Sequence, residues 1–336
     1  MDLVATWYRK RLSPWLWPLA PLSLLYWVVT GLRRWGFSCG LLASRRVPVP
    51  VIVVGNITVG GTGKTPLVIA LAEQLAVAGY RPGIASRGYG ANPPLVPFLV
   101  TADKPASQCG DEPLLLSRRT GLPVVIDPDR PAACRYLTDH CDCDVIISDD
   151  GLQHYRMQRD IEIVVLDGSR GVGNGMLLPM GPLREPVSRL DKVDAIVVNG
   201  ADSVVGVGHA PAHAMSIAAT QLVALESGNT IDTGSWNSNK KVHAVAGIGN
   251  PQRFFDSLRA LGFTPIEHSF ADHHRFSSDD IRFDDELPVI MTEKDAVKCA
   301  QLAPGERYWY LKVDAELPAA FFERVLQRLR QLKAAR

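Results

Sequence analysis

Short apolar runs recur along the first two thirds of the chain, and stretches with helical spacing separate several of them. The runs are rich in valine and isoleucine and lie at residues 50–55, 123–127, 144–150, 161–167 and 195–199. Continuous runs of this kind are typical of strands buried on both faces. Their alternation with helices predicts an α/β protein with a mostly parallel sheet flanked by helices, and with sites at the carboxyl ends of the strands.

The pattern changes after residue 209. Residues 210–239 alternate polar and apolar positions, as extended linker strands do, and a strand at 242–248 then precedes a helix at 252–261. We therefore expect four parts: an N-terminal segment (1–46), a first α/β domain (47–209), linker strands (210–239) and a smaller second α/β domain (240–336).

The last predicted helix, 318–334, is amphipathic. We expect its apolar stripe to pack on the second domain, and contact with lipid is the alternative. The stripe consists of Phe321, Val325, Leu326, Leu329 and Leu332.

The N-terminal segment has the composition of a membrane-associated helix. Residues 14–31 carry no charge, and residues 1–46 hold five of the seven tryptophans and seven Lys/Arg against one acid. Because Pro18 and Pro21 remove backbone donors, we expect a broken first half and a helix over 22–33, too short to cross a bilayer easily. Aromatic and basic residues together favour the headgroup layer, so the segment is predicted to lie on a membrane surface. A helix hairpin buried against the domain is the alternative.

Composition and charge exclude several classes of protein. A chain of 336 residues with 46% hydrophobic and 21% charged residues is neither disordered nor a polytopic membrane protein. Its 36 basic and 35 acidic residues leave a net charge of +1, which argues against nucleic acid as a partner. The six cysteines form no CxxC pair, so we expect reduced thiols in a cytosolic body.

The first predicted strand leads directly into a phosphate-binding pattern. The stretch TVGGTGKT fits GxxxxGK[ST] except at its first position, where threonine replaces glycine. Glycines let successive N–H groups point at phosphate oxygens, and the N-terminus of the following helix adds positive charge. Lys64 is expected to reach the β- and γ-phosphates of ATP, and Thr65 to bind Mg²⁺. The predicted ATP-binding residues are Thr58, Val59, Gly60, Gly61, Thr62, Gly63, Lys64 and Thr65.

An acidic pair ends another predicted strand. Asp149 and Asp150 follow the run Val145–Ile147, as the metal-binding acid of a nucleotide site follows its strand. One of the two carboxylates is expected to bind the metal while its neighbour contacts a second group. Which of them binds the metal is left open.

Seven strings occur in the order typical of one enzyme family. They are VGNITVGGTGKTP (54–66), SRGYG (86–90), GDEP (110–113), DDGLQH (149–154), LLPMGPLREP (177–186), FADHHRF (270–276) and MTEKDAVK (291–298). Together they resemble the tetraacyldisaccharide 4′-kinases, the lipid A kinases of Gram-negative envelope synthesis, whose phosphate loop is itself atypical at its first position. The resemblance implies a P-loop NTPase-like kinase domain at 47–209.

The resemblance also implies an activity and a location. The family transfers the γ-phosphate of ATP, with Mg²⁺, to the 4′-hydroxyl of a tetraacylated glucosamine disaccharide 1-phosphate, which gives lipid IVA. The expected partners are this glycolipid and a membrane surface, with no nucleic acid. The expected location is the inner membrane, peripheral or monotopic, with the catalytic domain on the cytoplasmic face.

The resemblance further implies that Asp111 of GDEP and His273 of FADHHRF form a catalytic dyad. His273 is the expected proton acceptor and Asp111 orients it, although the reverse assignment stays open. Two alternatives compete with this interpretation: Asp111 as the N-cap of a helix, and His274 in place of His273.

Other strings supply further candidates. Glu185 of LREP is expected near the metal and the phosphates, or else as a solvated loop charge, and Arg184 beside it is expected to meet a phosphate. Residues 292–295 (TEKD) are expected either to contact the nucleotide base or to cap a helix. Contacts to the acceptor or the nucleotide are expected from Arg87, Gln153 and His154.

Two rival functions are also consistent with the phosphate loop, namely a membrane-bound P-loop ATPase and a nucleotide-sensing module. Neither requires the dyad together with the apolar N-terminal segment. If the two dyad residues belong to different domains, the dyad forms only when the domains close, which would exclude water from the γ-phosphate.

Overall fold

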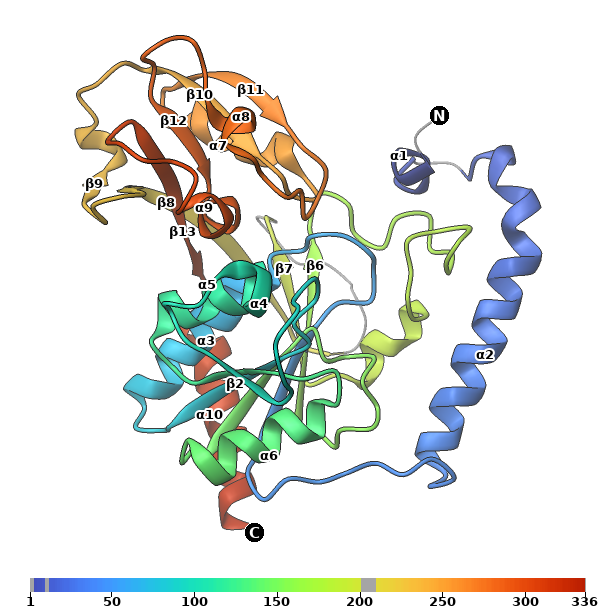
Figure 1. Ribbon diagram of the computed structural model, residues 1–336. Coiled ribbons are helices and arrows are strands. Elements are labelled where there is room, and N and C mark those ends of the chain that lie inside the picture. The colour runs from blue at the N-terminus through green and yellow to red at the C-terminus, as the bar shows by residue number, and fades with distance from the viewer. Residues whose placement is uncertain (1–2, 10–11, 201–209, 336) are drawn as a thin grey trace.

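Thirteen hydrogen-bonded strands pass through both halves of the molecule (Figure 1). The computed structural model describes residues 3–9, 12–200 and 210–335, so the predicted end of the first domain at 201–209 lies outside the described residues. In spatial order the strands are β11 (Thr264–Ser269), β10 (Lys241–Ala246), β12 (Val289–Thr292), β13 (Tyr308–Glu316), β8 (Ala212–Ala224), β7 (Ala195–Asn199), β6 (Ile161–Asp167), β1 (Val51–Gly55), β5 (Val145–Asp149), β2 (Pro82–Ser86), β4 (Val124–Ile126) and β3 (Phe98–Val100), with β9 (Thr230–Asp232) beside β8.

The first half confirms the predicted mostly parallel sheet. Neighbours from β4 through β2, β5, β1 and β6 to β7 all run parallel, and only the edge strand β3 runs antiparallel. All five predicted runs form strands in this part of the sheet. Strand β2 was not predicted, because its sequence PGIAS holds proline and glycine, which have low β-propensity. It is nevertheless buried along its whole length.

Helices cover both faces of this sheet. One face carries α3 (Lys64–Val77), α5 (Asp111–Thr120) and α10 (Ala319–Ala334), and the other carries α6 (Arg130–His140) and the 3₁₀ helix η2 (Val187–Lys192). Alternate residues of β1 separate the two layers, since Ile52 packs with the first set and Val53 with the second. The short helix α4 (Ala106–Cys109) precedes α5.

The second half continues the same sheet. Strands β11, β10, β12 and β13 are parallel, with α7 (Pro251–Ala260), α8 (Ser278–Ile281) and α9 (Glu293–Cys299) between them in the chain. Strand β8 pairs with β7 through residues 212–215 and with β13 through residues 216–224. The predicted linker at 210–239 thus holds β8, β9 and the 3₁₀ helix η3 (Thr233–Ser235), while the domain boundaries stay predictions.

The expectation that the last helix packs on the second domain was wrong. Phe321, Val325 and Leu329 of α10 are buried in the core of the first half, together with Leu67 and Leu71 of α3. The reason lies in β13, which stays paired with β8 as far as Glu316 and so carries the chain back toward β7. In Figure 1 the red helix α10 lies among the elements of the first half.

This packing predicts a large stability effect for Phe321→Ala. The Phe321 side chain is 0% exposed, so the substitution leaves a cavity and should lower the free energy of unfolding by about 3–5 kcal/mol. Chemical denaturation of the full chain measures it. The control Gln327→Ala, on the exposed side of the same helix, should change it by less than about 0.5 kcal/mol. Equal effects of the two substitutions would contradict the described packing.

The N-terminal segment forms a longer helix than predicted. It contains α1 (Leu3–Trp7), the 3₁₀ helix η1 (Pro14–Leu19) and α2 (Ala20–Ser38), in place of a single helix over 22–33. Pro21 lies in the first turn of α2, where a missing N–H costs nothing, so it begins the helix rather than breaking it. Pro18 lies in the interior of η1, which is a 3₁₀ segment.

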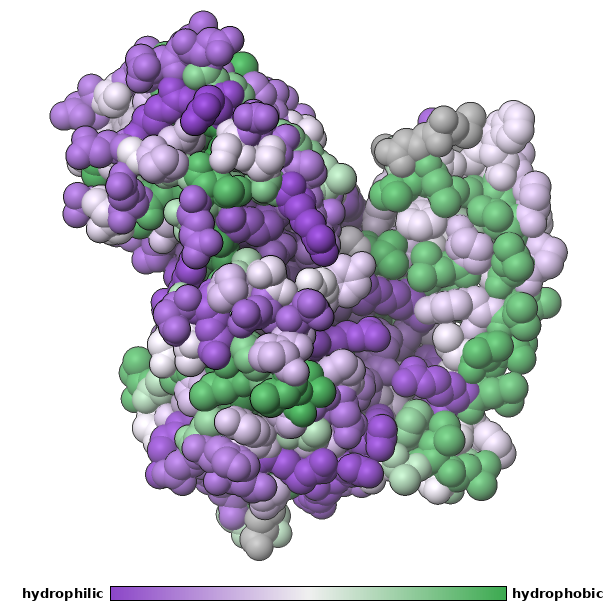
Figure 2. Space-filling view, in the orientation of Figure 1, coloured by the Kyte–Doolittle hydropathy of each residue, from purple (hydrophilic) through white to green (hydrophobic). Residues whose placement is uncertain are grey.

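Helix α2 lies along the outside of the first half. It is attached through a few hydrogen bonds, from Ser23 Oγ to the Leu177 carbonyl at 2.7 Å and from the Tyr26 hydroxyl to the Arg184 carbonyl at 3.1 Å. Its outer face is apolar and exposed, as the green band along this helix in Figure 2 shows. Residues 14–38 are long and apolar enough to cross a membrane, as judged by length and composition, and almost none of them is buried. The alternative of a buried helix hairpin was therefore wrong.

Candidate active site

The phosphate loop follows β1 and is held by contacts on both sides. The Val59 N–H donates to the Pro182 carbonyl at 2.9 Å, and the Asn199 amide at the end of β7 donates to the Thr62 carbonyl at 3.0 Å. Gly63 has φ +91°, and a Cβ there would lie 2.3 Å from Asn199 Nδ2, so only glycine fits. These contacts fix the loop just before Lys64 begins α3.

Several polar atoms of the loop are buried without a protein partner. Neither the Thr62 hydroxyl nor Asn56 Oδ1 has a hydrogen-bond partner among the described residues. Lys64 Nζ lies 3.5 Å from Asp150 Oδ1, and the lysine side chain is only 14% exposed. Buried polar groups are normally paired, so this set indicates a polar ligand at the loop, as the phosphates of ATP would be.

Asp149 and Asp150 lie beside the loop but in different environments. Burial, together with the nearby charges of Glu112 and Asp150, raises the pKa of Asp149 to about 7. Burial also opposes ionisation of Asp150, but the charges of Lys64 and Arg184 outweigh it and lower the pKa of that carboxyl. Arg184 Nη1 lies 3.4 Å from Asp150 Oδ2, so the predicted phosphate-binding arginine does face this site.

The residues at this site fit a magnesium ion bound together with phosphates. Asp150 Oδ1 is buried and accepts no hydrogen bond from the described residues. Thr65 follows Lys64 in the first turn of α3. Within residues 3–9, 12–200 and 210–335, no three His, Cys, Asp or Glu side chains form a metal cage. Mg²⁺ commonly takes one or two protein carboxylates and completes its shell with phosphates and water, so Asp149 and Asp150 supply enough carboxylates.

Glu185 is buried, so its alternative as a solvated loop charge was wrong. Its carboxylate accepts from the Tyr155 hydroxyl at 2.5 Å and from Gln153 Nε2 at 2.9 Å. Arg189 Nε and Arg34 Nη1 lie 3.3 and 3.6 Å from Oε2. Both oxygens therefore have partners, and Glu185 holds the Gln153 side chain in place. Its role as a metal ligand stays a prediction.

Asp111 and His273 come together although they are far apart in the sequence. His273 Nδ1 lies 3.4 Å from Asp111 Oδ2, and its ring lies 5.0 Å from the ring of Tyr89. Asp111 begins α5 after Gly110, which is the N-cap residue, so the N-cap alternative for Asp111 was wrong. His273 has φ +60°, a rare conformation for a residue with a side chain and one that often marks a functional position.

The neighbouring histidine is engaged elsewhere. His274 Nε2 lies 3.3 Å from Asp280 Oδ2, and its ring stacks on Phe270 at 4.7 Å. Its Asp280 partner also completes the capping box of α8. His274 therefore packs within the second half, and the geometry favours His273 as the dyad member.

Helix α9 contributes two lysines near the dyad, of which the sequence interpretation gave Lys298 no role. Lys298 Nζ lies 3.9 Å from Asp111 Oδ2 and 2.7 Å from Asp295 Oδ1, and its side chain is 9% exposed. Lys294 Nζ lies 3.0 Å from Glu112 Oε1. Thr292 caps α9 by accepting from the Asp295 N–H, which confirms the helix-cap interpretation of TEKD. A contact of TEKD with the nucleotide base stays a prediction.

Arg130 is a second missed residue. It begins α6, is buried, and donates from Nη2 to the Asp149 carbonyl at 2.6 Å, while Nη1 has no hydrogen-bond partner among the described residues. Burial lowers the pKa of Arg130 to about 10, so it stays charged at neutral pH. Burial and the charge of Arg130 also lower the pKa of His154 to about 4, which keeps that imidazole neutral. Arg87 lies exposed on the loop after β2.

Comparison with known proteins agrees with this geometry. Residues 15–330 match the family model described as tetraacyldisaccharide-1-P 4′-kinase. The tetraacyldisaccharide 4′-kinase of Pseudomonas paraeruginosa is 49% identical over 332 residues, which cover 99% of this chain and 98% of the relative. That of Stutzerimonas stutzeri is 51% identical over 332 residues, which cover 97% of each chain.

A solved structure shows the same fold. The crystal structure of LpxK from Aquifex aeolicus in complex with ATP superposes with a TM-score of 0.80 and 26% sequence identity, covering 94% of this chain and 99% of that chain. The fold of this chain is thus that of a solved member of one enzyme family. The chain belongs to the tetraacyldisaccharide 4′-kinase family, the ATP-dependent phosphotransferases of lipid A biosynthesis.

Proposed function

We propose that this chain transfers the γ-phosphate of ATP to the 4′-hydroxyl of tetraacyldisaccharide 1-phosphate, giving lipid IVA, at the cytoplasmic face of the inner membrane. The observation that carries the proposal is the contact between Asp111 and His273, because Asp111 begins α5, which covers the same face of the sheet as the helix α3 that follows the phosphate loop. Glu112, next to Asp111, lies near enough to Asp149 to help raise the pKa of that carboxyl, which supports one site for the dyad and the acidic pair.

The geometry supports distinct roles for the two dyad residues. Asp111 faces His273 Nδ1, and Nε2, which lies 3.9 Å from Asp272 Oδ1, would accept the proton of the acceptor hydroxyl. The hydroxyl oxygen then forms a bond to the γ-phosphorus while the bond to the β-phosphate oxygen breaks, and ADP leaves. In the reverse assignment Asp111 takes the proton and His273 holds Asp111 in place. Lys298 supplies a nearby positive charge in either case.

Lys64, Arg184 and the loop N–H groups would stabilise the charge on the transferred phosphate. Asp150, Asp149 and Thr65 are the residues proposed to hold Mg²⁺, which would neutralise the phosphates when bound. Glu185 is the fourth proposed metal ligand. The loop residues Thr58 to Gly63 would surround the phosphates with backbone donors.

Transfer of label separates this proposal from its two rivals. The full chain is incubated with γ-labelled ATP and purified tetraacyldisaccharide 1-phosphate in detergent micelles, and the products are separated. Label on the lipid is expected. Free phosphate alone would indicate the ATPase, and nucleotide binding without turnover would indicate the sensing module; either result overturns the proposal.

We further propose that α2 and η1 place the enzyme on the membrane. Trp15, Trp17, Trp27 and Trp35 are each more than half exposed, and aromatic side chains of this kind favour the membrane interface. The double variant Leu24→Asp, Trp27→Asp changes only exposed residues, so it should fold and bind less to vesicles. We expect sedimentation with inner-membrane vesicles to fall about tenfold or more. Val77→Asp, which changes an exposed apolar residue of α3, is the control and should sediment like the parent.

A further inference from the structure

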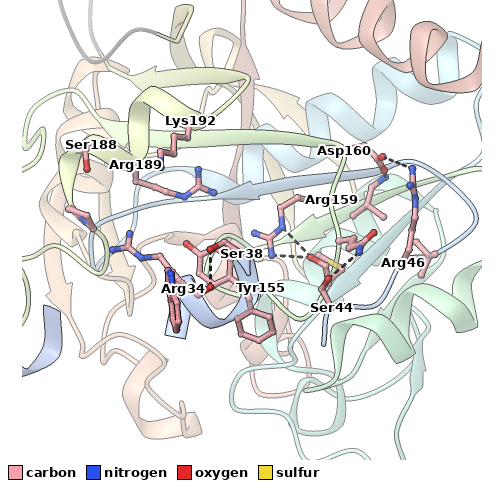
Figure 3. Close-up of a pocket in the computed structure, with 17 residues that line it drawn as sticks. Arg34, Ser38, Ser44, Arg46, Tyr155, Arg159, Asp160, Ser188, Arg189 and Lys192 are labelled. Carbon is pink, nitrogen blue, oxygen red and sulfur yellow. Dashed lines mark hydrogen bonds and ion pairs between the residues drawn. The ribbon is translucent and has the colours of Figure 1, made fainter. Parts of the chain in front are cut away.

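A cavity that the proposed reaction does not use lies away from the phosphate loop. It has a volume of about 680 Å³ and is lined by the last turns of α2, residues 44–47, the loop 155–160 and η2 (Figure 3). Val51, which begins β1, and Asp160, which precedes β6, lie on its wall. The cavity is therefore at the amino ends of these parallel strands, whereas the phosphate loop is at their carboxyl ends. The dyad and the phosphate loop take no part in it, and Glu185 is connected to it through its ion pairs with Arg34 and Arg189.

The cavity is cationic. Five basic side chains line it, namely Arg34, Arg46, Arg159, Arg189 and Lys192. Three carboxylates face them: Glu162 pairs with Arg159 and Arg189, Glu185 with Arg34 and Arg189, and Asp160 with Arg46. Two positive charges remain in excess. Figure 3 shows Arg189 and Lys192 at one end of the cavity and Arg46 at the other.

The excess charge is accessible to a ligand. Lys192 is exposed and makes no ion pair with any described residue. Arg46 keeps 62% of its side chain exposed, and its contact with Asp160 is long at 3.7 Å. The hydroxyls of Ser44 and Ser188 add hydrogen-bond donors to the same wall, whereas that of Ser38 already donates to the Trp35 carbonyl. Ammonium, guanidinium and hydroxyl groups together are the usual partners of a phosphate.

The cavity borders the apolar face of α2. Trp35 lines it and is 60% exposed, and Leu32, one turn earlier on the helix, is 62% exposed. A molecule with its phosphate in the cavity would thus reach this apolar face with the part that follows the phosphate. A soluble phosphate compound has no apolar part that could contact this face. A membrane phospholipid carries a phosphate and apolar acyl chains in one molecule.

We propose that this cavity binds the headgroup of an anionic phospholipid, with the phosphodiester at the Lys192 end of the cavity and the acyl chains along Trp35 and Leu32. The excess of two positive charges selects an anionic headgroup over a zwitterionic one. This lipid is neither substrate nor product. It fixes the end of α2 to the first half at the membrane surface.

Direct binding tests the proposal on the full chain. Short-chain phosphatidylglycerol, below its micelle concentration, is titrated into the protein and the heat of binding is measured. Short-chain phosphatidylcholine and inorganic phosphate are titrated in parallel. Phosphatidylglycerol should bind about tenfold more tightly than either. Equal binding of inorganic phosphate would reveal a simple phosphate site, and equal binding of phosphatidylcholine would show that charge plays no part; either result overturns the proposal, as does the absence of binding.

Two variants connect the binding to the cavity. Lys192→Glu should weaken phosphatidylglycerol binding about tenfold, and Ser188→Trp, which fills the cavity without changing its charge, should do the same. Both residues are exposed, and the thermal unfolding midpoint of each variant reports whether it folds. Arg9→Glu reverses an exposed charge of the same N-terminal segment outside the cavity and should bind like the parent. An equal loss in Arg9→Glu would show that only the general surface charge acts, and would overturn the proposal.

Discussion

Replacing Asp111 with asparagine is expected to lower kcat for lipid phosphorylation by about 10²–10⁴-fold, with KM for ATP changed by less than about threefold. Asparagine keeps the size of the side chain, but it cannot accept a proton and no longer provides a charged partner for His273 Nδ1. The loss therefore falls on the chemical step and not on nucleotide binding. Steady-state kinetics at saturating lipid measures both constants.

The double variant shows whether the two residues act as a unit. Asp111→Asn combined with His273→Asn should be no slower than the slower single variant, because removing one member already disables the pair. Independent losses that multiply would contradict the dyad. Asp279→Asn, an exposed aspartate of the same charge on α8, should keep the parent rate. A parent-like rate in Asp111→Asn itself would exclude any catalytic role for this carboxylate.

Removing the Lys64 side chain should have a comparable effect. Lys64→Ala is expected to lower kcat/KM for ATP by about 10²–10³-fold, since it removes a nearly buried positive charge from the phosphates. It also leaves Asp150 without its 3.5 Å partner, so a negative carboxylate then faces the negative triphosphate. Initial rates over a range of ATP concentrations measure the loss.

Lys241→Ala is the matched control, because this exposed lysine begins β10, away from the phosphate loop and the dyad. It should change kcat/KM for ATP by less than about threefold. If Lys64→Ala lost no more activity than this control, the phosphate loop would not be the ATP site.

Local patterns made the phosphate loop and its sheet predictable. The strand residues 51–55, the loop glycines and the start of α3 are consecutive, so their spacing alone determines which groups meet. The dyad is different, because Asp111 and His273 are 162 positions apart and were paired only through the resemblance to a known family. No local period connects α5 with the loop after β11.

Tertiary packing determines the features that the sequence predictions got wrong or missed. The apolar stripe of α10 indicates that the helix is half-buried but not which half it covers, and the long pairing of β13 with β8 decides that. Arg130 and Lys298 resemble ordinary helix-surface cations in the sequence. Arg130 is buried beside the Asp149 carbonyl because it begins α6 shortly after the carboxyl end of β4. Lys298 lies in the last turn of α9 and reaches Asp111 from there.

The return of the chain through β13 has a consequence for the order of synthesis. The ribosome makes β1, α3 and the rest of the first half early, but the surface of α3 that contacts Phe321, Val325 and Leu329 can be covered only when α10 has emerged. Leu67 and its neighbours on the nascent chain thus stay without their final partner until the second half has been synthesised. The two halves therefore mature together and cannot be completed one after the other during translation.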